Sequence, residues 1–432
     1  FYLSAAQVDT DGFNAFHQEN PEAGTLIDED GYENTTLHAR GGWNIDPDLR
    51  AQLVVRDTDS TSEFDRCSFP AINDCVGYFD QQNLRGSVTH GNSAGDNTLS
   101  YSKTDVERTN YAGGEVSYDI EGEIAKWELN GRVSLSDVHT LVYGAEHRRD
   151  RVKELERDQR GAYLEYQGAY ADRFYLTAGL PQDDNEDFGG NTSYRFSAAY
   201  LFPQTSNGVL KLKSSVGTGF RAPSLFEIDY NRSQENPALT ELGPEESRGI
   251  DVGIEYLGND GIHLEAVVFD QKIDDEIYFD LAGFTGYLQG GQSSESRGLE
   301  LIGQWPLSDQ LALNSNYTYV DAEADDGSPR SRQPKHLANV GVRYTPTADW
   351  TIALDWRTAR DRYDGDNKLE DYDVLSANVR YQLVDGIVVY LRGENVLDEE
   401  YTDVANFNAD GELTGYYNHS GAAGYAGVEF TF

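Results

Sequence analysis

Residues 350–357 read WTIALDWR, and the alternation in this stretch decides the fold. Apolar side chains fall on every second residue from Trp350 to Trp356, with small, polar or charged residues between them. Because successive side chains of a strand point to opposite faces, this period predicts a β-strand with one apolar and one polar face. The same alternation runs through 208–222 and 246–258. Runs of 10 to 15 residues are near the ~9–11 that cross a bilayer at a tilt, and exceed the ~5–6 usual in globular proteins.

The connections between these runs differ in length and composition. Short ones carry tight-turn residues, as in 46–48 and 384–386, whereas long ones over 13–32, 223–245, 322–333 and 402–420 are polar and rich in Gly, Asp and Ser. Short turns at one rim and long loops at the other are typical of outer-membrane barrels. We therefore predict an all-β fold, an antiparallel transmembrane β-barrel of about 20 strands, with residues 1–432 forming one barrel domain.

The composition excludes several classes of protein. Hydrophobic residues make up 38% of the chain, the mean hydropathy is −0.62, and no run of 18 apolar residues occurs, which excludes a helical membrane protein. The 28 Tyr, 18 Phe and 5 Trp suit the aromatic girdles of a barrel. A net charge of −41 argues against a nucleic-acid partner, which needs clustered Lys and Arg. This acidity fits a solvated, salt-adapted surface, outer loops that hold divalent cations, or both.

The two cysteines, Cys67 and Cys75, lie close together in the sequence RCSFPAINDC. This spacing in a Pro/Asn/Asp-containing loop favours a local disulfide formed in an oxidising compartment over a free pair or a metal site completed elsewhere. The chain has no methionine and no signal peptide, so we interpret it as a mature or trimmed fragment. The last strand alternates and stops on Phe432, which resembles an outer-membrane assembly signal.

No catalytic pattern is found in the sequence. The eight histidines form no H-x-x-x-H pair or other metal spacing, and no G-x-S-x-G elbow occurs. We therefore expect no enzyme. GTGFRA at 217–222 matches a dinucleotide fingerprint, but Pro223 follows at once and we expect no amphipathic helix and no βαβ unit there.

Several longer segments resemble the TonB-dependent receptor family of the outer membrane. VGTGFRAPSLFEIDY (216–230) followed by NPALTELGPEESRGIDVGIEY (236–256) is similar to its mid-barrel signature. SRGLEL (296–301), YTYVDAEA (317–324), RQPKH (332–336) and GENVLDEEY (393–401) resemble its later strands in the family order. The ordered set covers essentially the whole chain.

The resemblance implies a barrel of the 22-stranded type with an N-terminal plug and a TonB-binding box. Neither the plug nor the box is in this sequence, and its first residues resemble the third barrel strand of the family. We therefore expect the plug and two strands to be missing, and no pairing between strand 1–12 and strand 421–432. The implied partners are TonB, outer-membrane lipids and lipopolysaccharide, and a small-molecule nutrient.

Within the family, the resemblance is closest to the vitamin B12 (cobalamin) transporters. IDEDGY (27–32) and FDRCSFPAINDC (64–75) resemble their calcium-binding loops, which implies Asp28, Asp30, Asp65 and Asp74 as calcium ligands. Calcium takes six to eight oxygen ligands, which such a set could begin to supply. A solvated acidic turn is the alternative interpretation. The spacing from Asp65 to Asp74 and the cysteine pair depart from the cobalamin-transporter pattern.

Two other functions remain open. A siderophore receptor would have the same barrel, although acidic loops disfavour an anionic ferric chelate. A plugless, porin-like diffusion channel would also explain the strands.

Overall fold

The computed structural model describes residues 1–432 except 20, 22–25, 69–70, 235–240, 281–282, 284, 408–411 and 432. The long strands belong to one sheet and are β1 (Tyr2–Phe13), β3 (Asp30–Asp46), β4 (Leu49–Phe64), β5 (Cys75–Asn92), β6 (Gly95–Ala112), β7 (Glu115–Ser134), β8 (His139–Val152), β9 (Leu155–Tyr170), β10 (Phe174–Asn185), β11 (Gly189–Thr192), β12 (Arg195–Leu201), β13 (Gly208–Arg221), β14 (Glu245–Gly258), β15 (His263–Asp274), β18 (Ser294–Pro306), β19 (Leu311–Glu323), β20 (His336–Tyr344), β21 (Trp350–Arg360), β24 (Tyr372–Val384), β25 (Ile387–Glu394) and β28 (Ala423–Phe430). The smaller elements are β2 (Phe16–Gln18), α1 (Leu225–Ser233), β16 (Ile277–Phe279), β17 (Tyr287–Gln289), β22 (Arg362–Asp364), β23 (Asn367–Leu369), β26 (Ala405–Phe407) and β27 (Leu413–Tyr417).

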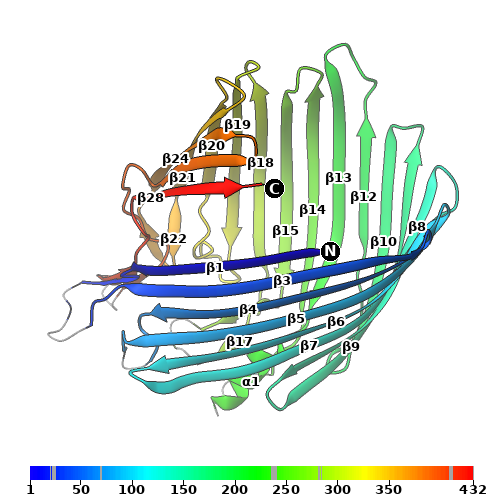
Figure 1. The fold of residues 1–432 in the computed structure, drawn as a ribbon. Coiled ribbons are helices and arrows are strands. Elements are labelled where there is room, and N and C mark those ends of the chain that lie inside the picture. Colours follow the sequence, from blue (N-terminus) through cyan, green and yellow to red (C-terminus); the bar gives the residue numbers. More distant parts are fainter. Residues whose placement is uncertain are drawn as a thin grey trace.

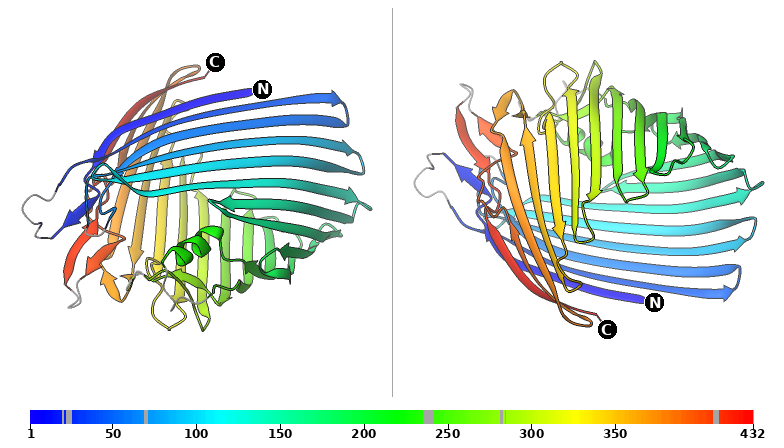
Figure 2. Two further views of the ribbon diagram at one scale, coloured as in Figure 1. Left: turned by 90° about the horizontal axis from the view of Figure 1, so that it is seen from below. Right: turned by 90° about the horizontal axis from the view of Figure 1, so that it is seen from above.

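Each strand of the sheet pairs antiparallel with the next strand along the chain, from β1 with β3 to β25 with β28. The sheet has 21 strands, and because β11 and β12 both lie opposite β10, they count as one interrupted strand. The prediction of about 20 barrel strands is confirmed. Figures 1 and 2 show this sheet curving round on itself, with the two chain ends at its facing edges.

The two edge strands are not paired with each other. β1 pairs with β3 and β28 pairs with β25, and no pairing between β1 and β28 is present in the described residues. The sheet formed by these residues is therefore open at one seam, as we expected from the sequence. The part of the chain that the structure describes holds no separate plug domain.

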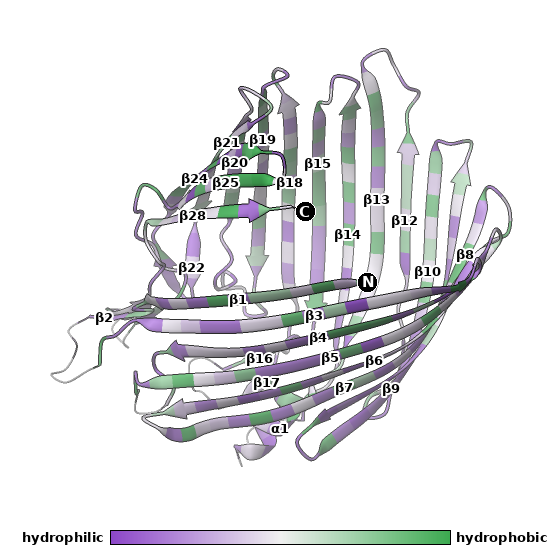
Figure 3. Ribbon diagram, in the orientation of Figure 1, coloured by the Kyte–Doolittle hydropathy of each residue, from purple (hydrophilic) through white to green (hydrophobic). Residues whose placement is uncertain are grey.

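The two faces of the sheet differ in polarity, as the alternation predicted. On β14, Ile250, Val252 and Ile254 point outward and are 41–48% exposed, whereas Asp251 lies on the opposite face and lines an inner hollow. Figure 3 shows hydrophobic and hydrophilic residues alternating along the strands. The outward apolar rows are not covered by a second sheet or by helices, so hydrocarbon is the environment that removes them from water, at about 25 cal/mol per Å². Buried apolar packing is local, as in the cluster of Ala359, Tyr372 and Val374.

The connections separate into two rims. Turns of a few residues, such as 47–48, 259–262 and 385–386, join strands at one rim, and the long loops lie at the other. Strands β4–β9 have 14 to 20 residues, more than the ~9–11 that a bilayer needs, so they extend beyond the membrane. No helix in the described residues has the length and apolar character needed to span a membrane.

The long loop predicted at 223–245 contains a short helix after Pro223. Ser224 caps the N-terminus of α1 and accepts from the backbone of Glu227, whose carboxylate accepts from the backbone of Ser224. This S-x-x-E capping box was readable in the sequence. The rejection of a dinucleotide site stands, because the flanking strands β13 and β14 pair antiparallel. Residues 285–293 lie outside the long strand that follows them: β18 begins at Ser294, and β17 forms a separate hairpin with β16.

Candidate functional site

The loops at the long-loop rim bring the predicted calcium ligands together. Asp30 begins β3, Asp65 directly follows β4, and Asp74 directly precedes β5, so the pairing of these three strands places the carboxylates at one edge. Asp30 Oδ2 accepts a hydrogen bond from the backbone N–H of Ala15 at 2.7 Å. The sequence analysis missed Glu63, whose Oε2 accepts from the N–H of Gly31 at 2.9 Å and so joins the same edge.

Burial and neighbouring negative charges both raise carboxyl pKa values at this edge. Asp65 is only 6% exposed, and burial, followed by the negative charges of Asp30 and Asp28, raises its pKa from 3.8 to about 6. The pKa of Asp28 is also raised, first by burial and then by the charges of Glu63 and Asp74. Burial first, and neighbouring negative charges second, thus disfavour the ionised forms of Asp65 and Asp28, which is a condition that a bound cation relieves.

The carboxylate oxygens at this edge are farther apart than the ligands of a bound metal ion would be. No three of these five carboxylates, Asp28, Asp30, Glu63, Asp65 and Asp74, have oxygens that all lie within 4.8 Å of one another. The set offers only hard oxygen ligands, which suit calcium rather than zinc or copper. The residues therefore fit calcium in chemistry, and calcium binding would require carboxylate oxygens of the two loops to move closer together.

A disulfide holds the second of these loops. Cys67 and Cys75 are joined, with their Cα atoms 6.0 Å apart. Beside them, the Arg66 guanidinium lies 4.8 Å from the ring centre of Phe16, so the first loop packs against the second. Phe432, expected to carry an assembly signal, lies outside the described residues.

Helix α1 and the β16–β17 hairpin form an aromatic cluster at the same rim. The rings of Phe226, Tyr230, Phe279 and Tyr287 meet edge to face or tilted, with centres 5.2–6.2 Å apart. Asn231 fixes the hairpin to the helix by donating to the carbonyl of Tyr287 at 2.8 Å and accepting from its N–H at 2.7 Å. Sequence reasoning missed this cluster because its members are far apart in the chain.

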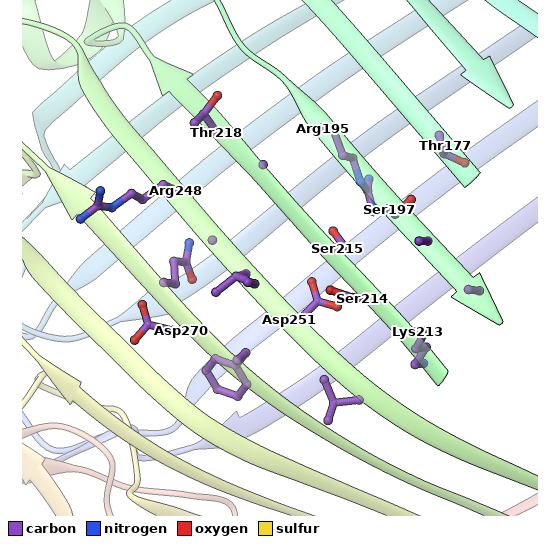
Figure 4. Close-up of a pocket in the computed structure, with 18 of the residues that line it drawn as sticks. Thr177, Arg195, Ser197, Lys213, Ser214, Ser215, Thr218, Arg248, Asp251 and Asp270 are labelled. Carbon is purple, nitrogen blue, oxygen red and sulfur yellow. The ribbon is translucent and has the colours of Figure 1, made fainter. Parts of the chain in front are cut away.

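The inner wall of the sheet carries a hollow of about 890 Å³ between β10 and β15, with both polar and apolar side chains in its lining. Figure 4 shows the side chains of Arg195, Ser215 and Asp251 lining this hollow. A second cavity, of about 590 Å³, lies between α1 and strands β6–β10 and is lined by residues such as Arg148 and Phe226. Both hollows combine apolar surface with a few charged or polar side chains, as ligand-binding cavities do.

A sheet of lipid-facing antiparallel strands, with long structured loops gathered at one rim, defines an integral barrel of the receptor type in the outer membrane. The chain belongs to the family described as TonB dependent receptor-like, beta-barrel, which matches residues 2–396. The family prediction and the outer-membrane location are therefore confirmed.

The similar proteins are named for more than one ligand. The chain is 24% identical over 422 residues to the vitamin B12 transporter BtuB of Photobacterium profundum, covering 92% of this chain and 65% of that protein. It is 24% identical over 306 residues to an iron-regulated outer membrane virulence protein of Vibrio cholerae, covering 61% of this chain and 46% of that protein. Among solved structures, a ferric enterobactin receptor (PfeA) mutant of Pseudomonas aeruginosa superposes with a TM-score of 0.79 at 16% identity, covering 100% of this chain and 75% of that one. The chain spans about half to two thirds of the first two curated relatives.

Proposed function

We propose that this chain is the barrel of an uptake receptor that captures cobalamin, or a similar corrinoid, at its long-loop rim and takes it inward through the lumen in a TonB-driven step. The observation that carries this proposal is the carboxylate edge around Asp65, where acids from two loops meet and where burial, followed by the charges of Asp30 and Asp28, raises the pKa of Asp65. Calcium would neutralise this edge and order both loops into a capture surface.

The choice of cargo follows from charge and from the relatives. The chain has a net charge of −41, and an acidic rim disfavours an anionic ligand while tolerating a neutral corrinoid or one bound through a cation. The vitamin B12 transporter of Photobacterium profundum aligns with 92% of this chain. TonB, and the lipids and lipopolysaccharide around the outer wall, are the partners that this function requires.

In this proposal calcium would be held by Asp28, Asp30, Asp65 and Asp74, with Glu63 beside them. The ion would supply positive charge and oxygen coordination at the loop edge. The protein residues do the positioning: Asp30 holds the first loop through Ala15, and the disulfide restrains the second loop.

A siderophore receptor is the second candidate, and the aromatic cluster favours it. Phe226, Tyr230, Phe279 and Tyr287 offer flat rings at the rim, where an aromatic chelate could stack. A relative in Pseudomonas aeruginosa, 28% identical over 201 residues, is the ferric enterobactin receptor PirA.

Calorimetric titration of the whole receptor separates these functions. We expect cyanocobalamin to bind with calcium and to bind much more weakly after chelation, while ferric enterobactin does not bind. Binding of ferric enterobactin but not of cyanocobalamin would instead indicate a siderophore receptor. Large constitutive currents of the whole receptor in planar bilayers would instead indicate a diffusion channel.

A further inference from the structure

A second group of metal-ligating side chains lies on the lumen wall, far from the loop edge. Glu255 near the end of β14, together with His263 and Glu265 at the start of β15, each offer one ligand atom within 4.8 Å of the others. Glu255 and Glu265 are direct cross-strand partners, and His263 is two residues before Glu265 on the same face. The short turn 259–262 joins the two strands, so the group lies near the short-turn rim.

Each of the two glutamates contacts a lysine through one carboxylate oxygen and faces His263 with the other. Glu255 Oε2 accepts from Lys211 Nζ at 2.9 Å, and Glu265 Oε1 accepts from Lys213 Nζ at 2.6 Å. The other two oxygens face His263: Glu255 Oε1 lies 3.1 Å and Glu265 Oε2 lies 3.9 Å from Nε2. The lysines thus fix the orientation of both carboxylates, and one oxygen of each is aimed at the imidazole.

A glycine makes this arrangement possible. Lys213 is on β13 and Glu265 is on β15, so the lysine must cross β14. It crosses at Gly253, its direct partner on β14, where a Cβ would lie 3.0 Å from Lys213 Cε. Lys213 lies at one end of the 890 Å³ hollow (Figure 4).

We propose that Glu255, His263 and Glu265 bind a zinc-class divalent ion on the lumen wall. Zinc bonds nitrogen and oxygen at about 2.0–2.2 Å, so neighbouring ligands of a tetrahedral ion lie about 3.3–3.6 Å apart. The separations of 3.1 and 3.9 Å at His263 Nε2 bracket this range, so small side-chain rotations would admit the ion. Three protein ligands leave a fourth position open to water or to another ligand.

The chemistry of the group selects among ions. An imidazole nitrogen suits zinc, cobalt, nickel or copper, whereas calcium and magnesium prefer oxygen alone. The side chains are accessible, because His263 is 26% exposed and Glu255 and Glu265 are 12% and 13% exposed. The two ammonium groups repel a cation, so they weaken the site without occupying its facing oxygens.

Zinc titration of the whole, tag-free receptor after chelator treatment tests this site. We expect a binding event that weakens by at least about tenfold in His263→Gln and in Glu255→Gln. His139→Gln is the matched control, because His139 also begins a strand at the same rim but bonds the Tyr166 hydroxyl at 2.6 Å rather than a carboxylate. This control should bind zinc like the native receptor.

Two further readouts separate metal binding from a purely structural ion-pair network. Lys213→Gln removes a repelling charge, so it should tighten zinc binding, and Co²⁺ should give the intense visible absorption of a low-coordinate site. Heat-modified gel mobility checks that each variant is folded. Equal zinc isotherms for the native receptor and folded His263→Gln or Glu255→Gln would overturn the proposal, as would equal competition by calcium.

Discussion

Replacing Asp65 with asparagine should stabilise the two loops of the carboxylate edge at neutral pH when calcium is absent. The folded pKa of Asp65 is raised from 3.8 to about 6, so the folded loop binds a proton more tightly than the unfolded loop. The resulting stability is present below about pH 4 and is lost as the pH rises through about 6. At about 1.4 kcal/mol per pKa unit, ionisation at pH 7 costs at most about 3 kcal/mol. Solvent screening at a loop rim reduces this to roughly 1.5 kcal/mol.

Hydrogen exchange of peptides from 14–30 and 63–76 measures this effect locally. The asparagine side chain in Asp65→Asn retains an oxygen that can accept the backbone hydrogen bond which Phe16 donates to Asp65. At pH 7.5 with chelator, we expect about tenfold slower exchange in Asp65→Asn than in the native receptor, because 1.4 kcal/mol is a factor of ten. At low pH the two should converge, since Asp65 is then protonated. Asp349→Asn, in a short turn at the opposite rim, is the control.

Calcium should reverse the difference in exchange rate between the native receptor and the Asp65→Asn variant, so that the native loops then exchange more slowly. It neutralises the native edge and slows its exchange at pH 7.5, whereas the Asp65→Asn variant lacks one anionic ligand and gains less. Faster exchange in Asp65→Asn at neutral pH without calcium would refute the electrostatic reasoning. A native receptor whose loops exchange at the same rate with and without calcium would refute the calcium site but not the repulsion.

Three other substitutions test the architecture. The double change Cys67→Ser/Cys75→Ser opens a short loop whose closure contributes roughly 2.5 kcal/mol to stability. Proteolysis should therefore cut 65–74 at lower protease concentrations than in the native receptor, and the reduced native receptor serves as the comparison. Ser224→Ala removes the N-cap of α1 and should cost about 1 kcal/mol of helix stability, measured as faster amide exchange in 225–233, whereas Ser233→Ala at the helix end should leave the N-terminal turn unchanged. Val252→Arg places a charge on the lipid face and should cost about 2–4 kcal/mol near the bilayer centre in urea unfolding from vesicles, while Ser215→Arg on the lumen wall should cost much less.

The barrel was predictable because each of its strands shows the alternation of apolar and polar residues in its own sequence. Ile250, Val252 and Ile254 face lipid and their neighbours face the lumen. The alternation in the sequence therefore predicts the two faces of the barrel wall without any knowledge of tertiary contacts. The carboxylate edge was predictable only through the family resemblance, which named four of its acids. Glu63 was missed because it is part of the alternating pattern of β4, and only the pairing with β3 brings it to Gly31.

The lumen group shows why sequence spacing is a poor guide to sites on a barrel wall. A helix displays metal ligands at three- and four-residue spacing, but on a strand the same face recurs at every second residue. H-x-E at 263–265 is therefore the signal, and it is too common to interpret alone. The third ligand, Glu255, lies across a turn, and its position depends on the cross-strand register.

The two candidate ion sites share one physical cause, which is the crowding of like charges by antiparallel pairing. Glu255 lies directly opposite Glu265, and like charges in that position repel. On the lumen wall this repulsion is offset inside the protein, because Lys211 and Lys213 take one oxygen from each carboxylate. In the described residues, no lysine pairs with Asp28, Asp30 or Asp65 at the loop edge, where burial, followed by the charges of Asp30 and Asp28, raises the pKa of Asp65. The lumen group can therefore remain ordered without an ion, whereas the loop edge is stabilised by a proton or a cation, and for this reason we expect the outer loops to be the part of the receptor that responds to calcium.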